Sequence, residues 1–309
     1  MKQIFRFMAL VLMLITTTSL SAQEEPQKRT VIIEPFTHSK TVSSTARDNL
    51  RSAVITGFSE INRFYLVDAT TDARLKTLFD DRSYEDVVTE SNWQTESTAA
   101  YKAINADRLL KGQIELISFY TKYNDEGEPI YWCDLNYTLQ LFDITNGTLI
   151  GSKSYKYSEL SVSTSEDAFN KCLNKIAGYH NGITKVKPDV LGFCNDYFKV
   201  NTYILELGEA DKKGNITDLW ISGGEEMGFL KGSIFVIYKE RKIGPKVARE
   251  KFAEVVAEEV LDGLTRCKVA KKYAALIQQE FYAGTTLIIE LDRQRGAAFG
   301  EAMGGLLGL

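Results

Sequence analysis

Two hydrophobic periods organise the first half of the chain. The apolar run Val31–Ile33 predicts a buried strand that Pro35 closes. Over residues 43–61, apolar side chains recur at steps of three and four, which predicts an amphipathic helix. The elements expected next are a strand at 63–69, helices at 70–80 and 95–105, and a helix end that leads into a strand over 104–123.

Strict alternation of apolar and polar side chains begins at residue 131. In the strand predicted over 131–141, one face is apolar, as in a half-solvated antiparallel strand. The opposite face carries Trp132, Asn136 and Gln140. A tryptophan that points away from an apolar row needs a cover, either from the same chain or from a partner. These three residues are therefore the candidate partner-binding site.

A hairpin signal and a further helix follow this strand. Asn146-Gly147 is the strongest short signal for a hairpin, so residues 113–157 are expected to form a three-stranded meander. A helix is expected from Ser165. The fold class predicted for the first half is α/β (α+β), with a mixed sheet and an antiparallel meander.

The second half of the chain is richer in strands. Two short strands around the turn "DKKGN" begin it, and "TTLIIELDR" is expected to close a small β-rich C-terminal domain. Residues 247–261 can be read as a strand or as a helix, since Phe252, Val255 and Val256 do not settle the period, and we favour strands. Asp262-Gly263 is a second hairpin signal.

The glycine-rich stretch "GGEEMGFLKGSIFVIY", Gly223–Tyr238, raises the question of a phosphate-binding loop. Such a loop needs Gly-Lys-Ser/Thr followed by a helix whose N-terminal amides face the phosphates. Here the order is Lys-Gly-Ser, and the β-branched and aromatic residues that follow favour a strand. We therefore predict a turn that leads into a strand.

The start of the chain predicts its compartment. Lys2 and Arg6 precede an apolar run at 7–15, and small polar residues lead to Ala22. This pattern is typical of a secretory signal peptide cut after Ala22, the alternative being an uncleaved anchor. We expect a periplasmic protein with no transmembrane span after cleavage, and association with the outer membrane stays open.

Length and charge limit the number of domains and the classes of partner that the chain suits. A chain of 309 residues suits about two domains. The expected division is a signal peptide at 1–22, an α/β domain at 23–185, a β-rich domain at 195–292 and a flexible tail at 293–309. The net charge is −4 and no basic stripe is visible, which argues against nucleic acid as a partner.

The cysteines fit no metal or redox motif. Their wide spacing is neither a CxxC nor a zinc pattern, and buried thiols and disulfides are equally compatible with it. The pairing therefore stays open for all four residues, which are Cys133, Cys172, Cys194 and Cys267.

Residues 29–185 resemble a known domain family. The pieces are "RTVIIEPF", "LRSAVITGF", "INRFYLVDA", "INADRLLKGQIE" and "LQLFDITNGTLIGSKSY", in this order. They resemble the CsgG-like domain of the curli secretion pore, which occurs in a related form in lipoprotein activators of penicillin-binding proteins. The resemblance implies that a helix turns through glycine into the central strand between Ala106-Asp107 and Gly112-Gln113. It also implies a non-enzymatic role in envelope assembly and binding.

The chain departs from the pore members of that family in two ways. No cysteine precedes Cys133, so the lipidated N-terminal cysteine of those members is not expected. Too few residues lie between about 157 and 165 for an inserted hairpin, because transmembrane strands need about 9–11 residues each. The resemblance therefore implies the periplasmic module without the pore. "GGEEMGFLKGSIFVIYKE" resembles a C-terminal β-barrel module of secreted envelope proteins, flagellar assembly proteins among them.

No catalytic, cofactor-binding or metal-binding residues are predicted. The two histidines, His38 and His180, have no HExxH-like neighbours, and no G-x-S-x-G motif is present. The pairs Glu225-Glu226 and Glu258-Glu259 are expected to be solvated.

The expected function is therefore non-catalytic assembly, secretion or activation of envelope machinery. It would act through contacts with envelope proteins or through self-association. The alternatives are a hydrolase of envelope polymers or another carbohydrate-active enzyme, and an oligomeric outer-membrane secretion component.

Overall fold

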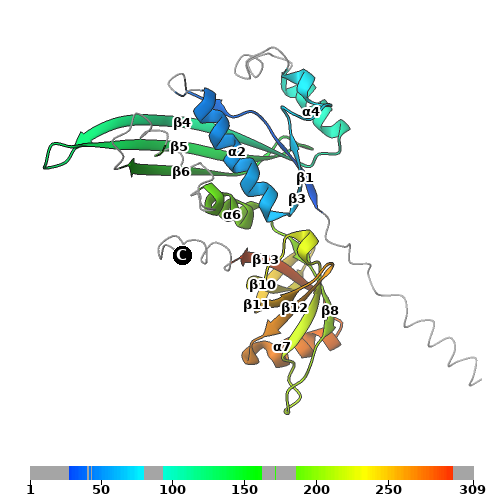
Figure 1. The fold of residues 1–309 in the computed structure, drawn as a ribbon. Coiled ribbons are helices and arrows are strands. Elements are labelled where there is room, and N and C mark those ends of the chain that lie inside the picture. Colours follow the sequence, from blue (N-terminus) through cyan, green and yellow to red (C-terminus); the bar gives the residue numbers. More distant parts are fainter. Residues whose placement is uncertain are drawn as a thin grey trace, which may run out of the picture.

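The chain folds into two sheets that follow one another along the sequence (Figure 1). The computed structural model describes residues 28–39, 42, 44–79, 93–161, 171 and 186–294. The first sheet is mixed and carries helices, whereas the second is antiparallel throughout. The predicted fold class is confirmed for both halves. The predicted signal peptide lies outside the described residues. The tail predicted from residue 293 starts too early, because Arg293 and Gln294 end strand β13, and the rest of it lies outside the described residues. The predicted domain boundaries stay a prediction.

The N-terminal sheet has the strand order β3-β1-β4-β5-β6, with β2 beside β4. Strands β1, β2 and β3 run parallel to their neighbours, and β4, β5 and β6 form the predicted antiparallel meander. Its elements are β1 (Arg29–Ile33), β2 (Thr37–His38), α2 (Ser44–Ile61), β3 (Phe64–Asp68), η1 (Lys76–Leu78), α4 (Trp93–Ala103), β4 (Arg108–Tyr123), β5 (Pro129–Asp143), β6 (Leu149–Ser161) and α6 (Val186–Tyr197).

Strand β1 is buried on both faces. Val31 and Ile33 belong to the core under α2 and α6, while Ile32 faces a second core that contains Tyr101 of α4. A strand covered on both faces needs an apolar side chain at every position. This explains the uninterrupted apolar run at the start of the domain.

Helix α6 was not predicted. Gly192 lowers its intrinsic propensity, but its buried face, which includes Val190 and Phe193, packs into the same core as α2. The helix predicted over 70–80 is wrong, because this stretch forms turns and the short 3₁₀ helix η1. There the Asp72 carboxylate accepts the backbone N–H of Arg74, a local bond that competes with a helix. The helix predicted from Ser165 lies outside the described residues except for Lys171, which is helical.

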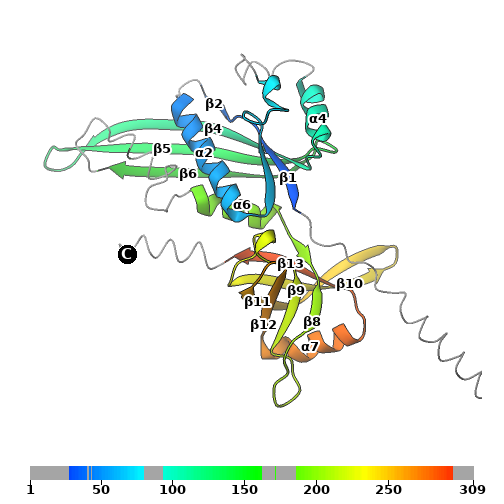
Figure 2. The same ribbon diagram turned by 45° about the vertical axis from the view of Figure 1, so that its right-hand side comes forward.

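Strands β4, β5 and β6 form a long ribbon. They run side by side past the helices in both views (Figures 1 and 2). Helices α2 and α6 pack against one face of this ribbon, and α4 packs at the β1 end of the sheet. We call the face opposite to α2 and α6 the outer face of the ribbon.

The C-terminal sheet is a nearly closed antiparallel barrel of order β7-β13-β10-β11-β12-β9-β8. The chain segment that forms β7 and β8 pairs with β13 on one side and β9 on the other, which brings the two ends of the sheet together. Its elements are β7 (Asn201–Thr202), β8 (Ile204–Leu207), β9 (Asp218–Ser222), η2 (Glu225–Met227), β10 (Ser233–Ile243), β11 (Lys246–Val260), β12 (Leu264–Val269), α7 (Lys271–Tyr282) and β13 (Leu287–Gln294).

Residues 247–261 form strand β11, as the sequence favoured. Ala253, Val255 and Ala257 are buried, and the residues between them point outward. The turn at Asp262-Gly263 joins β11 to its antiparallel neighbour β12, as predicted. Helix α7 was not predicted, and it lies at the barrel end remote from the first domain (Figures 1 and 2).

The two domains meet at the glycine-rich turn of the barrel. Gly228 has φ 69°, and a Cβ atom built there would lie 2.0 Å from the carbonyl oxygen of Ile61. The side-chain amide of Asn62 donates a 3.1 Å hydrogen bond to the carbonyl of Glu225. The turn therefore packs directly against the corner between α2 and β3.

Candidate functional site

The three predicted site residues lie in one row on the outer face of the ribbon. Trp132, Asn136 and Gln140 are all half-buried residues of β5. They are spaced four residues apart, so roughly 13 Å separates neighbouring members of the row. The structure thus places them on one face without bringing their side chains together. Their role in binding stays a proposal.

Trp132 belongs to a cluster of aromatic and cationic side chains. Its ring is nearly parallel to that of Tyr120, with 4° between the planes and 6.3 Å between the centroids. The ammonium of Lys122 lies 4.6 Å from the Trp132 ring and 5.4 Å from the Tyr120 ring. The indole N–H is buried and has no hydrogen-bond acceptor among the described residues. A buried donor of this kind costs free energy until an acceptor reaches it.

The middle of the row is a closed polar network. Thr138, between Asn136 and Gln140, donates a 2.7 Å hydrogen bond to the Glu115 carboxylate. Since its only hydroxyl proton is used there, Ser154 donates to Thr138 across 2.7 Å. Thr138, Glu115 and Ser154 thus bond to one another, whereas the indole N–H at the Trp132 end of the row has no acceptor among the described residues.

A buried carboxylate lies on the other side of the ribbon. Asp189 of α6 accepts hydrogen bonds at one oxygen from the hydroxyls of Tyr137 and Tyr157. The hydroxyl of Tyr155 donates a 3.0 Å hydrogen bond to the backbone carbonyl of Asp189. Three tyrosines from β5 and β6 therefore hold α6 against the sheet through one residue.

The electrostatics of this cluster do not suit proton transfer. Burial raises the pKa of Asp189 above its ordinary value, although the two tyrosine hydrogen bonds oppose the rise. Burial and the neighbouring carboxylate raise the pKa of Tyr137 well above its ordinary value, and the pKa values of Tyr155 and Tyr157 are also raised. Phenols that hold their protons this firmly act as structural donors.

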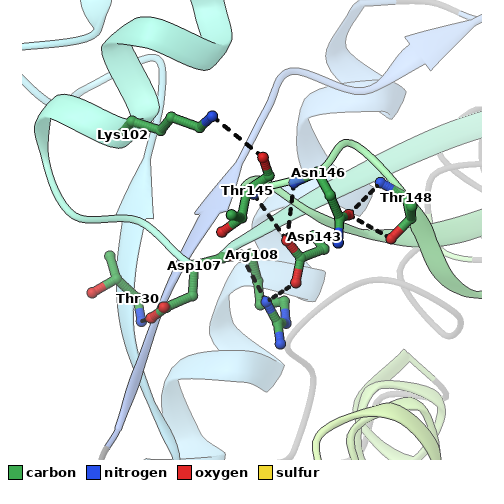
Figure 3. A network of polar contacts seen from close by, with 8 residues as sticks. All are labelled: Thr30, Lys102, Asp107, Arg108, Asp143, Thr145, Asn146 and Thr148. Atoms are coloured by element: carbon green, nitrogen blue, oxygen red, sulfur yellow. Dashed lines mark hydrogen bonds and ion pairs between the residues drawn. The ribbon is translucent and has the colours of Figure 1, made fainter.

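The sequence pieces that carry the family resemblance form a polar network at the base of the ribbon (Figure 3). Asp107 accepts the backbone N–H of Thr30, which ties β4 to β1. Arg108 donates to the Asp143 carboxylate at 2.7 Å, and that carboxylate also accepts the N–H of Asn146 in the following turn. Each charged group pairs within the fold, so this motif stabilises the junction of four segments.

The expected helix-to-strand turn through Gly112 is wrong. Helix α4 ends at Ala103, and the residue with positive φ in the connection is Asn105, at 55°. Gly112 lies inside β4, where the ring of Phe36 packs against its backbone. A Cβ atom there would lie 2.3 Å from that ring, so glycine is needed for close packing rather than for a turn.

The glycine-rich stretch forms a turn that leads into a strand, as predicted. The short η2 segment ends at Gly228 in the left-handed region, Gly232 also has positive φ, and β10 begins at Ser233. The segment that follows Lys231 is a strand, so it presents no helix N-terminus to a phosphate.

Replacing Lys231 with alanine is therefore expected to change the free energy of unfolding by less than about 0.5 kcal/mol, because an exposed side chain of this kind contributes little. Neither the parent protein nor the variant should bind ATP or GTP. Thermal unfolding and nucleotide titration check both statements. Nucleotide binding that disappears in the variant would contradict them.

Other titratable groups serve the fold. His38 contacts the carbonyl of Ser39 and the guanidinium of Arg47, and His180 lies outside the described residues. Glu225, Glu258 and Glu259 are exposed, as expected, whereas Glu226 is half-buried and its carboxylate accepts the backbone N–H groups of Gly224 and Gly263. Across the described ranges, no group of three or more His, Cys, Asp or Glu side chains has metal-binding geometry.

The cysteines in the described ranges are buried. Cys194 and Cys267 are thiols outside any disulfide, and burial raises the pKa of Cys194 to about 12. Cys133 is buried in the core of the first domain, and Cys172 lies outside the described residues. Among the helices that the structure describes, none has the length and apolar character to cross a membrane.

Comparisons with known proteins give structural matches only. No family model and no curated protein matches the sequence. The lipoprotein GNA1162 from Neisseria meningitidis matches with 13% identity and a TM-score of 0.34, over 46% of this chain and 91% of that chain. The LpoB C-terminal domain from Escherichia coli matches with 11% identity and a TM-score of 0.30, over 46% of this chain and 92% of that one.

A third structure is a PelC dodecamer from Paraburkholderia phytofirmans. It matches with 14% identity and a TM-score of 0.29, over 50% of this chain and 92% of the PelC chain. In each case the match spans about half of this chain and nearly all of the other. The chain is thus distantly similar in structure to these proteins.

Proposed function

We propose that this protein is a non-catalytic component of the bacterial cell envelope that binds another envelope protein through the Trp132 end of the ribbon's outer face. The observation that carries the proposal is the buried indole N–H of Trp132, which lacks an acceptor among the described residues. A partner that supplies an acceptor there removes the cost of the unpaired donor.

The surroundings of Trp132 suit a protein partner. Tyrosine, tryptophan and a nearby cation combine a large contact area with polar handles, a combination enriched in binding hot spots. The Asp134 carboxylate accepts a 2.6 Å hydrogen bond from Ser158, which keeps the strands beside the aromatic pair in register. The signal-peptide pattern and the resemblance to the CsgG-like domain support the periplasm as the location.

The proposal is tested by capture from native envelopes. Trp132→Ala is expected to weaken partner capture by about 2 kcal/mol or more, as hot-spot truncations do. Because the side chain is only half-buried, we expect the loss of folding stability to be below the roughly 3–5 kcal/mol of a fully buried tryptophan. Cross-linking followed by mass spectrometry, with thermal unfolding of the same variant, measures the two effects separately.

The control is Tyr282→Ala, which removes an exposed aromatic ring (74% accessible) from the barrel helix α7. It should leave the captured partners unchanged. If Trp132→Ala captures every partner of the parent protein, or fails only because it unfolds, the outer face is not the binding site. Turnover of an envelope polymer by the purified protein would replace the proposal with the hydrolase alternative.

A further inference from the structure

A cleft of about 560 Å³ opens at the junction of the two domains. One wall is the end of α2 with Glu60 and Asn62, and the other comprises the barrel turn around Glu225 and Leu230 together with the end of β11. None of the lining residues belongs to the ribbon of β4, β5 and β6 or to the polar network of Figure 3. The cleft is therefore a different site from the Trp132 row.

The walls of this cleft are held firmly. The Asn62 side chain bonds to the Glu225 carbonyl, and Gly228 contacts the carbonyl of Ile61 so closely that a Cβ atom would not fit. The Glu226 carboxylate bridges the backbone of the turn to Gly263 at 2.7 Å. The space between the walls is therefore defined by backbone contacts rather than by movable side chains alone.

The lining is acidic. Glu60, Glu225, Glu258 and Glu259 face one lysine, Lys231. Three of these carboxylates are paired with cations that do not themselves line the cleft, at distances of 2.7 to 3.9 Å. Glu225 forms no ion pair within the described ranges and is exposed. A ligand with a positive group would supply the missing partner.

The cleft also has an apolar component. Phe229, Ile61 and Val260 contribute to its lining, and the Leu230 side chain is 45% exposed beside them. An exposed leucine next to carboxylates favours a ligand that carries an aliphatic group beside its charge. The ammonium of Lys28, which does not line the cleft, donates a 2.9 Å hydrogen bond to the Asn62 side chain.

We propose that this cleft binds a short segment of a partner protein that presents a lysine or arginine beside an aliphatic residue. The cation pairs with Glu225, the one lining carboxylate without an ion pair in the described ranges, and the aliphatic group covers Leu230. This second site is independent of the proposed Trp132 surface.

The test uses the full mature chain and two blocked peptides, acetyl-Lys-Leu-Lys-Leu-Lys-amide and acetyl-Glu-Leu-Glu-Leu-Glu-amide. Binding is followed by NMR shift perturbation of the protein amides. The lysine peptide should shift the amides of the barrel turn and of the end of α2, with affinity that falls as salt rises. The glutamate peptide should not bind.

Two variants test the charged contact and the apolar contact separately. Glu225→Gln combined with Glu258→Gln, and separately Leu230→Ser, should each weaken the lysine peptide roughly tenfold, about 1.4 kcal/mol. The matched control Glu209→Gln changes an exposed carboxylate that does not line the cleft, so it should alter the affinity less than about twofold. Trp132→Ala should also leave it unchanged, which separates this site from the proposed function.

The proposal is overturned if the lysine peptide fails to bind, or if it binds equally to the parent protein and to the cleft variants. It is also overturned if sedimentation reveals self-association that Leu230→Ser abolishes, because the cleft would then belong to a second copy of the chain. Thermal unfolding of each variant confirms that lost binding does not come from lost folding.

Discussion

Replacing Asp189 with alanine is expected to destabilise the N-terminal domain by about 3–5 kcal/mol. The change removes the acceptor of two tyrosine hydroxyls, and hydrogen bonds to a charged group contribute about 1.5–3 kcal/mol each. It also leaves the hydroxyl of Tyr137 buried without an acceptor on α6. Urea denaturation at neutral pH measures the loss as a lower midpoint with an unchanged slope.

The asparagine variant isolates the charge from the hydrogen bonds. Since burial raises the folded-state pKa of Asp189 above 3.8, the folded protein binds this proton more tightly than the unfolded chain does. The contribution of Asp189 to stability is thus largest below pH 3.8 and falls as the pH rises through the raised pKa. The side chain in Asp189→Asn carries no charge at any pH but keeps an acceptor oxygen. Its contribution to stability should therefore not fall as the pH rises.

Stability curves between about pH 3.5 and 7 compare the two variants. Asp189→Asn should be more stable than Asp189→Ala by about 2 kcal/mol, since it keeps the tyrosines bonded. Equal stability of the two variants would show that the tyrosine bonds do not hold α6. A wild-type stability that rises with pH over this window, with the rise absent in Asp189→Asn, would contradict the sign of the shift.

The alternation of apolar and polar residues predicted much of the ribbon. Residues 131–141 have the period of two, and both the strand and its two faces follow from it. The alternation does not predict the Asp189 cluster, because the carboxylate of Asp189 and the hydroxyl of Tyr137 are 52 residues apart in the sequence. Local pattern determines which way a side chain points, whereas the partner that it meets depends on the tertiary fold.

The missed helices have a related cause. Gly192 weakens the helical signal of α6, so its existence depends on the core that Phe193 and Cys194 enter. Residues 70–80 show the opposite error. Their composition permits a helix, but aspartate side chains bond to nearby backbone groups and produce turns instead.

The candidate site was predictable only in outline. The position of Trp132 on the outer face follows from the sequence, but its stacking with Tyr120 and the cation above both rings do not. Those contacts depend on the register in which Tyr120 of β4 pairs with Trp132 of β5. The interdomain cleft could not be predicted at all, because its walls come from segments about 160 residues apart and local signals do not report how domains dock.

Replacing Gly228 with alanine is expected to weaken the contact between the two domains. The left-handed conformation costs about 1–2 kcal/mol for a residue with a Cβ atom. The new methyl group would also lie 2.0 Å from the Ile61 carbonyl, and relieving such an overlap costs about 1–3 kcal/mol. The total expected loss is about 3 kcal/mol, and part of it should appear as separation of the domains.

Gly232→Ala is the matched control, because Gly232 also has positive φ but has open space where its Cβ atom would lie. It should lose only the conformational part, about 1–2 kcal/mol. Fluorine NMR of 5-fluorotryptophan-labelled protein reports each domain separately, since Trp132 lies in the first domain and Trp220 in the barrel. Urea titration then gives one unfolding midpoint for each probe.

In the parent protein and in Gly232→Ala, the Trp132 and Trp220 signals should disappear together, since the docked turn couples the domains. In Gly228→Ala the two midpoints should separate, because the methyl group forces the barrel turn away from the corner at Ile61. The lysine peptide should also lose its binding in this variant if the cleft needs both walls. Coincident midpoints in Gly228→Ala, with a stability equal to that of Gly232→Ala, would mean that the domains do not depend on this contact.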